Sequence, residues 1–219
     1  MITTVHSPTR TESERGKETA RLSAPHGTKR AKRVRDPERG LKILSAAATL
    51  FADRGFHAVS LGEIGSASGI VGSGIYRHFD NKYAVLVALL DKAISDLLDE
   101  AEQIADAGLS SSDILTRLVH QQINFCIDRR LEVQLYRQEI SSLNPEDARR
   151  LKRMQRRYNE EWIATLLETR PELDEANARA MVYSAIGAIQ SIVNFDSGLP
   201  REALVHRMDK IARACLFVA

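Results

Sequence analysis

Apolar residues recur along most of the chain at the three- and four-residue intervals of amphipathic helices. The clearest case follows Lys82, where one helical face up to about residue 105 carries Val85, Leu86, Leu89, Leu90, Ala93, Ile94, Leu97 and Leu98. A second helix is predicted over about 37–54 from the spacing of Ile43, Ala46, Ala47, Leu50 and Phe51. No stretch alternates apolar and polar residues as a half-buried strand does, so the pattern predicts an all-α fold.

Caps, glycines and prolines mark the ends of the predicted helices. Asp36 and Pro37 begin the first helix, and Gly55 supplies its left-handed exit. Ser60 and Glu63 form a Ser-x-x-Glu capping box, which begins a short helix over about 60–67. Further helices are expected over about 111–128, 131–142, 146–169, 174–196 and 201–217. With one short helix before residue 80, the chain has about nine helices and no internal repeat.

The two short helices between residues 60 and 79 have the spacing of a helix-turn-helix unit, with a glycine in the turn. The second helix begins with Gly72, Ser73 and Gly74, whose small size lets the backbone and the Ser73 hydroxyl approach base edges in a major groove. Polar side chains that suit phosphates flank it: Ser60, Tyr76, Arg77, His78 and Lys82. We therefore expect these eight residues to contact DNA.

Other readings of this segment are simpler. Leu50, Phe51, Ile64 and Phe79 are expected to form the small core that holds three helices together. His78 is either a DNA contact or a packed histidine. Gly72 and Gly74 each weaken the second short helix by about 1 kcal/mol relative to alanine. We therefore expect this helix to be partly frayed until DNA orders it.

Charge is unevenly distributed along the chain. The whole sequence has 31 basic and 29 acidic residues, whereas residues 1–40 have ten basic and five acidic ones. Residues 1–35 also lack apolar periodicity and contain Pro8 and Pro25, so we expect a disordered basic arm. Such an arm either contacts phosphates, releasing their counterions, or is a solvated leader.

Composition and motifs exclude several classes of protein. The chain has 219 residues, 43% of them hydrophobic, which suits one or two compact domains and excludes a disordered or collagen-like chain. No run of about 18 apolar residues suggests a membrane span, and no secretory signal begins the sequence. Cys126 and Cys215 lie far apart and form no disulfide framework, so a reducing, cytoplasmic setting is expected.

Catalytic and cofactor signatures are missing from the sequence. It has no HExxH, GxSxG or Walker motif, and its six histidines form no ligand cluster, so we expect neither an enzyme nor a metal or cofactor. The spacing of Gly69, Gly72 and Gly74 reverses the dinucleotide fingerprint and follows a helix instead of a strand.

The segment from Leu41 to Leu86 resembles the N-terminal DNA-binding domain of the TetR family of bacterial transcriptional regulators. The resemblance is carried by Leu50-Phe51, Gly55-Phe56, Ser60, Ile64, Gly69-Ile70, Tyr76-Arg77-His78-Phe79, Lys82 and Leu86. Val71 departs from the pattern, because Ser or Thr is usual there. The resemblance implies a DNA-binding domain over 36–83 and a ligand-binding and dimerisation domain over 84–219, although the second part matches only in helical architecture.

Residues 180–195 carry no charge, so the helix that contains them needs partners on both sides. A strip of small residues (Ser184, Gly187, Ala188, Ser191) and a stripe on the last helix (Leu204, Met208, Ile211, Cys215) are the expected contacts of a homodimer. The resemblance implies the same four-helix arrangement, and a monomer is the alternative. A twofold dimer would place two reading helices about 34 Å apart, as a palindromic double-stranded DNA operator requires.

The resemblance also implies a cavity for a small effector within each subunit. Candidate ligand-binding residues are Leu97, His120, Gln122, Ile123, Asn124, Cys126, Tyr136, Tyr158, Trp162 and Tyr183, with Phe125, Leu135 and Ile186 as further candidates for its wall. Each is also a candidate for ordinary core packing. The mainly apolar set favours a hydrophobic ligand, either lipid-like or an acyl-CoA. The cations Arg149, Arg150, Lys152, Arg153, Arg156 and Arg157 form either a solvated face or a site for coenzyme A phosphates.

These features favour a DNA-binding repressor that a hydrophobic ligand releases from its operator. We expect the ligand to shift the helix that begins at Lys82 and so to change the separation of the two reading helices. The alternative is a helical adaptor or ligand-binding protein that does not bind DNA.

Overall fold

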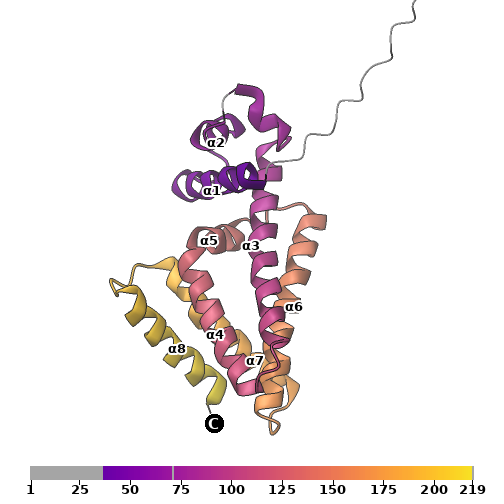
Figure 1. Ribbon diagram of the computed structural model, residues 1–219, viewed down its shortest axis with the longest axis vertical. Coiled ribbons are helices and arrows are strands. Elements are labelled where there is room, and N and C mark those ends of the chain that lie inside the picture. Colours follow the sequence, from indigo (N-terminus) through magenta and orange to yellow (C-terminus); the bar gives the residue numbers. More distant parts are fainter. Residues whose placement is uncertain (1–36, 71, 219) are drawn as a thin grey trace, which may run out of the picture. The chain divides into compact units, whose positions relative to one another are not determined.

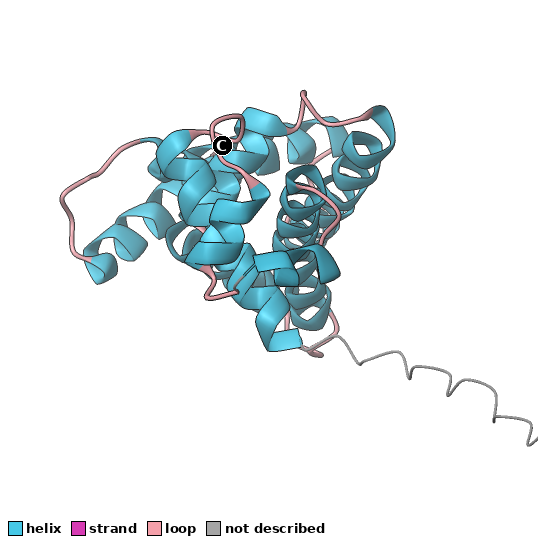
Figure 2. Cartoon of the chain, turned by 90° about the horizontal axis from the view of Figure 1, so that it is seen from above, coloured by secondary structure: helices cyan, strands magenta, loops and turns pink. Residues whose placement is uncertain are grey.

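The computed structural model describes residues 37–70 and 72–218, which form eight α-helices and two 3-10 helices and no strand (Figures 1 and 2). The α-helices are α1 (Pro37–Arg54), α2 (Leu61–Ala67), α3 (Lys82–Ala105), α4 (Ser111–Asp128), α5 (Arg130–Glu139), α6 (Pro145–Thr169), α7 (Glu175–Gln190) and α8 (Arg201–Phe217). The 3-10 helices are η1 (Gly72–Arg77) and η2 (Ser191–Asn194). The predicted all-α fold is confirmed. The expected basic arm over 1–35, the Asp36 cap and Val71 lie outside the described residues.

Side-chain caps begin five of these helices. The capping side chains are Ser60 for α2, Asn81 for α3, Ser110 for α4, Asn144 for α6 and Asp174 for α7. Each accepts a hydrogen bond from a backbone amide that has no partner within its helix, an interaction worth about 1 kcal/mol. At Ser60 the predicted capping box is complete, because the Glu63 side chain also accepts from the Ser60 amide.

Two predicted helices differ from the structure. The helix expected over 174–196 ends at Gln190 and continues as η2. Ser191 is the reason, because its hydroxyl donates to the Ala188 carbonyl at 2.7 Å and so competes with the helical bonding pattern. The helix expected over 131–142 ends at Glu139, whose carbonyl accepts from the Ser142 amide in a turn.

Two apolar clusters hold the described residues together. The first joins α1, α2 and η1 to the first half of α3, and includes the fully buried Ile64 and Ile75. The second joins the rest of α3 to α4, α6, α7 and α8, and includes the fully buried Trp162. α3, which Figure 1 shows passing α1 and then running beside α6, contributes to both. So does the short α5, with Leu135 in the first cluster and Val133 in the second.

Among the described residues, no helix combines the length and the apolar character needed to cross a bilayer.

Candidate nucleic-acid interface and internal cavity

The short helix that is predicted to enter a major groove forms the 3-10 helix η1, which packs on α2. Ile75 is fully buried, and a Cβ added to Gly65 of α2 would lie 3.3 Å from the Ile75 Cβ. A Cβ added to Gly74 would lie only 2.7 Å from Cγ2 of Ile70. Both glycines therefore permit the close approach of η1 to α2 and to the turn between them. The tight turns of η1 hold these six residues in place around one buried anchor.

The outer side of η1 is polar and accessible. Ser73, Tyr76 and Arg77 are exposed, and Tyr76 retains 59% of its accessible surface. Within 37–70 and 72–218 these three side chains have no hydrogen-bond or ion-pair partner. His78 is half-buried. The α2–η1 unit therefore presents unpartnered donors on a narrow support.

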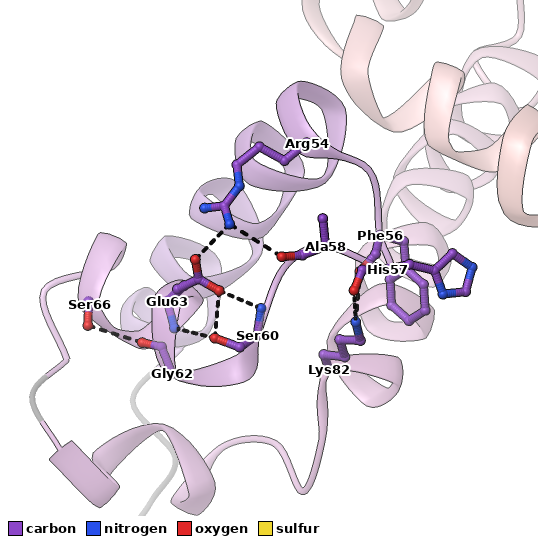
Figure 3. Close-up of polar contacts among 9 residues, drawn as sticks. All are labelled: Arg54, Phe56, His57, Ala58, Ser60, Gly62, Glu63, Ser66 and Lys82. Carbon is purple, nitrogen blue, oxygen red and sulfur yellow. Dashed lines mark hydrogen bonds and ion pairs between the residues drawn. The ribbon is translucent and has the colours of Figure 1, made fainter.

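Ser60, a predicted phosphate contact, already has partners in the α2 cap (Figure 3). Its hydroxyl donates to the Glu63 carboxylate at 2.7 Å and accepts from the Glu63 amide at 3.2 Å. The Ser60 hydrogen bonds, with Arg54 2.8 Å from the carboxylate, lower the pKa of Glu63 to about 2. A phosphate contact by Ser60 stays a prediction, and it would compete with this neighbouring carboxylate.

Lys82, the first residue of α3, also bonds within the chain (Figure 3). Its ammonium donates to the carbonyls of Phe56 and His57, both at 2.9 Å. It also lies 4.8 Å from the centre of the Phe56 ring, a cation–π distance. Lys82 therefore ties the start of α3 to the segment between α1 and α2. Two of its three donors are occupied, so a phosphate contact through the third stays a prediction.

A cavity of about 320 Å³ lies among α3, α4, α5, α6 and α7. Six of the candidate residues line it: Leu97, Gln122, Phe125, Tyr136, Tyr183 and Ile186. Ile123, Cys126, Tyr158 and Trp162 do not, because they are buried against other core side chains instead. His120 and Asn124 line a separate, more polar hollow of about 580 Å³ between α3 and α4. The expected pocket thus mixes residues of the cavity, the core and the second hollow.

Sequence reasoning missed polar residues of the cavity wall. These are Glu132 and Arg137 on α5 and Gln155 and Asn159 on α6. The only signal on α6 was that both amides stand between the charged and the apolar side of one helix. On α5 the sequence singled out Tyr136 but gave no signal for Glu132 or Arg137.

The cationic run of α6 divides into two groups. Arg150 pairs with Asp91 and Asp147, and Arg157 lies 2.8 Å from Glu102. Lys152, Arg153 and Arg156 have no ion-pair partner among the described residues. Arg149 donates to the Pro145 carbonyl at 2.8 Å. Part of the run therefore fixes α6 to α3, and the other part is available to solvent.

The expected pairing surface on α7 and α8 is largely accessible, with one correction. Ser184, Gly187 and Ile211 are exposed, and Ala188, Ser191, Leu204 and Cys215 are half-buried. Met208 is only 5% exposed because it packs into the chain's own core, so it is not available for a surface contact. The same helices and their ends expose further large apolar side chains, namely Tyr183, Phe195, Leu199, Phe217 and Val218.

Comparison with known proteins identifies the family to which this helical fold belongs. Residues 43–89 match the family model of bacterial regulatory proteins of the tetR family, and residues 108–194 match that of the tetracyclin repressor-like C-terminal domain. The HTH-type transcriptional repressor KstR2 of Rhodococcus jostii is 30% identical over 129 residues, which are 58% of this chain and 63% of that protein. KstR2 of Mycolicibacterium smegmatis is 29% identical over 61% of this chain and 68% of its own. The chain thus matches less than two thirds of the Rhodococcus protein's length.

Solved structures share the fold. A tetR-family regulatory protein from Rhodococcus RHA1 superposes with a TM-score of 0.72 at 16% identity, over 83% of this chain and 98% of its own. FadR of Bacillus subtilis, solved with stearoyl-CoA, has a TM-score of 0.66 at 18% identity over 82% and 98%. AibR, solved with isovaleryl coenzyme A and operator DNA, has a TM-score of 0.65 at 21% identity over 78% and 96%. At these identities the likeness concerns the fold alone. Together, the two family models and the helical architecture show that this chain belongs to the tetR family of bacterial regulatory proteins.

Proposed function

We propose that this chain is a sequence-specific DNA-binding transcriptional regulator, a repressor that a small apolar ligand releases from its operator. The observation that carries the proposal is the α2–η1 unit. Its buried anchor, Ile75, fixes a narrow segment whose outer side chains, Ser73, Tyr76 and Arg77, have no partner within the described residues. Unpartnered donors on a slim support are what entry into a major groove requires.

The proposed contacts divide into reading and positioning. Gly72, Ser73 and Gly74 lead into the groove, where the backbone and one hydroxyl approach base edges. Tyr76, Arg77 and His78 contact phosphates, which fix the register of η1 on the duplex. Lys82 acts mainly through the chain itself, because its bonds to Phe56 and His57 hold α3 against the segment before α2.

Two copies pair through the accessible surface of α7 and α8. Small residues on α7, among them Ser184 and Ala188, allow a second helix to approach closely, and Ile211 on α8 adds apolar area. The isologous pair forms a four-helix bundle. It presents two η1 segments to successive turns of a palindromic operator, about 34 Å apart.

The internal cavity holds the effector. Its α3 side is apolar, with Leu90, Ala93, Ile94 and Leu97. An apolar wall of this kind favours an acyl-type or lipid-like ligand. The acyl-CoA complexes of FadR and AibR, which share the fold, support this ligand class.

Two helices connect the cavity to the helices α1, α2 and η1, which we propose to bind DNA. α3 lines the cavity and begins at Lys82, which is bonded to the segment between α1 and α2. α5 lines the cavity with Tyr136 and packs on α1. A ligand that displaces either helix changes how η1 meets DNA. A coupling free energy of about 1–3 kcal/mol would weaken operator binding roughly 5- to 150-fold.

Titration of labelled DNA flanking the protein's own gene, at fixed salt and against unrelated competitor DNA, tests the proposal. We expect selective binding by the full chain, and release when decanoyl-CoA is added. Arg77→Gln should weaken binding to all sequences and lower the salt slope by about one, while Arg153→Gln, on α6, should not. A chain that binds neither DNA would instead favour the helical adaptor, and equal binding of flanking and unrelated DNA would refute sequence-specific recognition.

A further inference from the structure

Hydrogen bonds within the chain orient several polar side chains of the cavity wall. Gln122 is 1% exposed, and its amide oxygen accepts from the Tyr158 hydroxyl at 2.7 Å. Its amide nitrogen donates to the Cys126 sulfur at 3.2 Å. These bonds fix which way the amide points. A primary amide has two N–H groups, and the second has no partner among the described residues.

A second amide in the wall has free donors. Asn159 is 6% exposed and lines the cavity, and its side-chain oxygen accepts from Gln155 at 3.1 Å. That bond leaves the Asn159 amide nitrogen, with two N–H groups, without a partner in the described part of the chain. These N–H groups are available to a molecule in the cavity, so the site favours one with an acceptor oxygen.

Among the described residues, the wall offers one unpaired charge, and it is positive. Its one acidic residue among those described, Glu132, lies 3.3 Å from the Arg129 guanidinium and is thereby compensated. Its one basic residue, Arg137, has no ion-pair partner within 37–70 and 72–218. Arg137 lines the cavity and is also exposed, so its guanidinium is accessible to a molecule that enters from the surface.

Further cations lie beside the cavity on α6. Lys152 and Arg156 precede Asn159 by seven and three residues, and so share its side of the helix. Both are exposed. Arg153, six residues before Asn159, is exposed too but points to a different side.

We propose that the effector is an amphiphilic anion whose apolar part lies along α3, whose acceptor oxygen meets Asn159 and Gln122, and whose negative group binds Arg137. The inference rests on the proposed effector role of this cavity and names the ligand class. The negative group is either the carboxylate of a free acid, held by Arg137 alone, or a phosphate of an acyl thioester, which extends to Lys152 and Arg156. Arg137 sets specificity in both cases, because a guanidinium prefers an ionised oxygen to a neutral one.

Calorimetric titration of the full chain with decanoate, decanoyl-CoA and 1-decanol tests this inference. At least one anionic probe should bind about tenfold or more tightly than 1-decanol. Arg137→Gln should weaken that anionic probe about tenfold or more and change 1-decanol less than twofold. Arg156→Gln should weaken decanoyl-CoA but not decanoate, which separates the two sources of charge. Arg153→Gln, the matched control, should change nothing.

Three results would overturn the inference: equal binding of 1-decanol and both anions, an equal loss of all probes in Arg137→Gln, or no binding of either anion at millimolar concentration. DNA titration of the same variants keeps the two proposals apart. If the native chain binds no anionic probe, and both it and Arg137→Gln still bind operator DNA, the ligand class is refuted and the regulator proposal stands. If the native chain binds the anions but no DNA, the regulator proposal is refuted and the ligand class stands.

Discussion

The ammonium of Lys82 donates to the backbone carbonyl of Phe56 at 2.9 Å and lies 4.8 Å from the centre of the ring of that same residue. One side chain therefore holds both the backbone and the aromatic ring of the segment between α1 and α2. Phe56 packs edge-on against Phe51 of α1, with ring centres 5.2 Å apart. The contact of Lys82 therefore extends to the apolar cluster that joins α1, α2 and η1 to α3. The start of α3 is thus tied to the unit that carries η1.

Replacing Lys82 with methionine should lower the free energy of unfolding by about 1–2 kcal/mol, because two carbonyls lose a charged donor. Operator affinity should fall equally for all DNA sequences, because η1 loses its support. The salt dependence of binding separates this role from a phosphate contact. An unchanged slope fits the positioning role, whereas a slope reduced by about one would show that the third donor of Lys82 meets a phosphate.

Gly74→Ala tests the close approach of η1 to the turn before it. The added Cβ would lie 2.7 Å from Ile70 Cγ2, so η1 must shift, at a cost of about 1–3 kcal/mol in urea-induced unfolding. DNA binding should weaken with it. Gly62→Ala is the matched control, since a Cβ there meets nothing closer than the Ser60 hydroxyl at 4.0 Å. Gly62→Ala should be neutral or stabilising, because alanine favours the helix. Equal losses in both variants would mean that the packing of η1 is not the limiting feature.

Acid should loosen the α2 cap over a defined range of pH. The bonds from Ser60 and the nearby Arg54 lower the pKa of Glu63 from 4.5 to about 2. A carboxylate with a lowered folded-state pKa stabilises the fold fully above the unfolded value, and this contribution is lost as the pH falls from about 4.5 to about 2. Comparing the unfolding of the native chain with Glu63→Gln checks it. The variant should show a shallower loss of stability across that range, and identical slopes would contradict the capping interaction.

Much of the structure of α1, α2 and the start of α3 was predictable from the sequence because its signals are local. The capping box needs only Ser60 and Glu63, and the apolar face of α3 repeats over enough turns to fix both helix type and burial. The break after Gln190 escaped prediction because the apolar pattern continues through Ile192 and Val193, while the competing Ser191 bond is a single local contact. Periodicity measures burial, and both residues are indeed buried.

The cavity was only partly predictable because its wall is assembled from five helices. Aromatic and apolar residues can be counted in a sequence, yet Tyr158 is buried in the core while Tyr183 lines the cavity. Arg137 resembles any other surface arginine until α5 is placed. Met208 shares the spacing of Ile211, but the rotation of α8 turns the first inward and the second outward. Such assignments depend on tertiary packing.

A charge placed on the pairing surface should separate two copies. Ser184 is exposed on α7 and does not line the cavity, so Ser184→Arg adds bulk and charge without touching the effector site. Light scattering after size-exclusion chromatography should show a dimer for the native chain and a monomer for the variant. Arg153→Glu, on the exposed side of α6, is the control and should stay dimeric. A native chain that is monomeric at micromolar concentration would refute the pairing proposal.

Removing one hydroxyl should test the orientation of the cavity wall. In Tyr158→Phe the amide oxygen of Gln122 loses its partner, and a buried acceptor left unpaired costs about 1–3 kcal/mol of stability. The amide is then held only by its bond to the Cys126 sulfur, so its remaining N–H is less firmly directed toward the ligand. Anion affinity should fall together with stability, whereas Tyr136→Phe, which lines the cavity without bonding Gln122, should leave stability nearly unchanged. If Tyr158→Phe lowers stability but binds decanoate and decanoyl-CoA as the native chain does, then Gln122 supports the core and does not read the ligand.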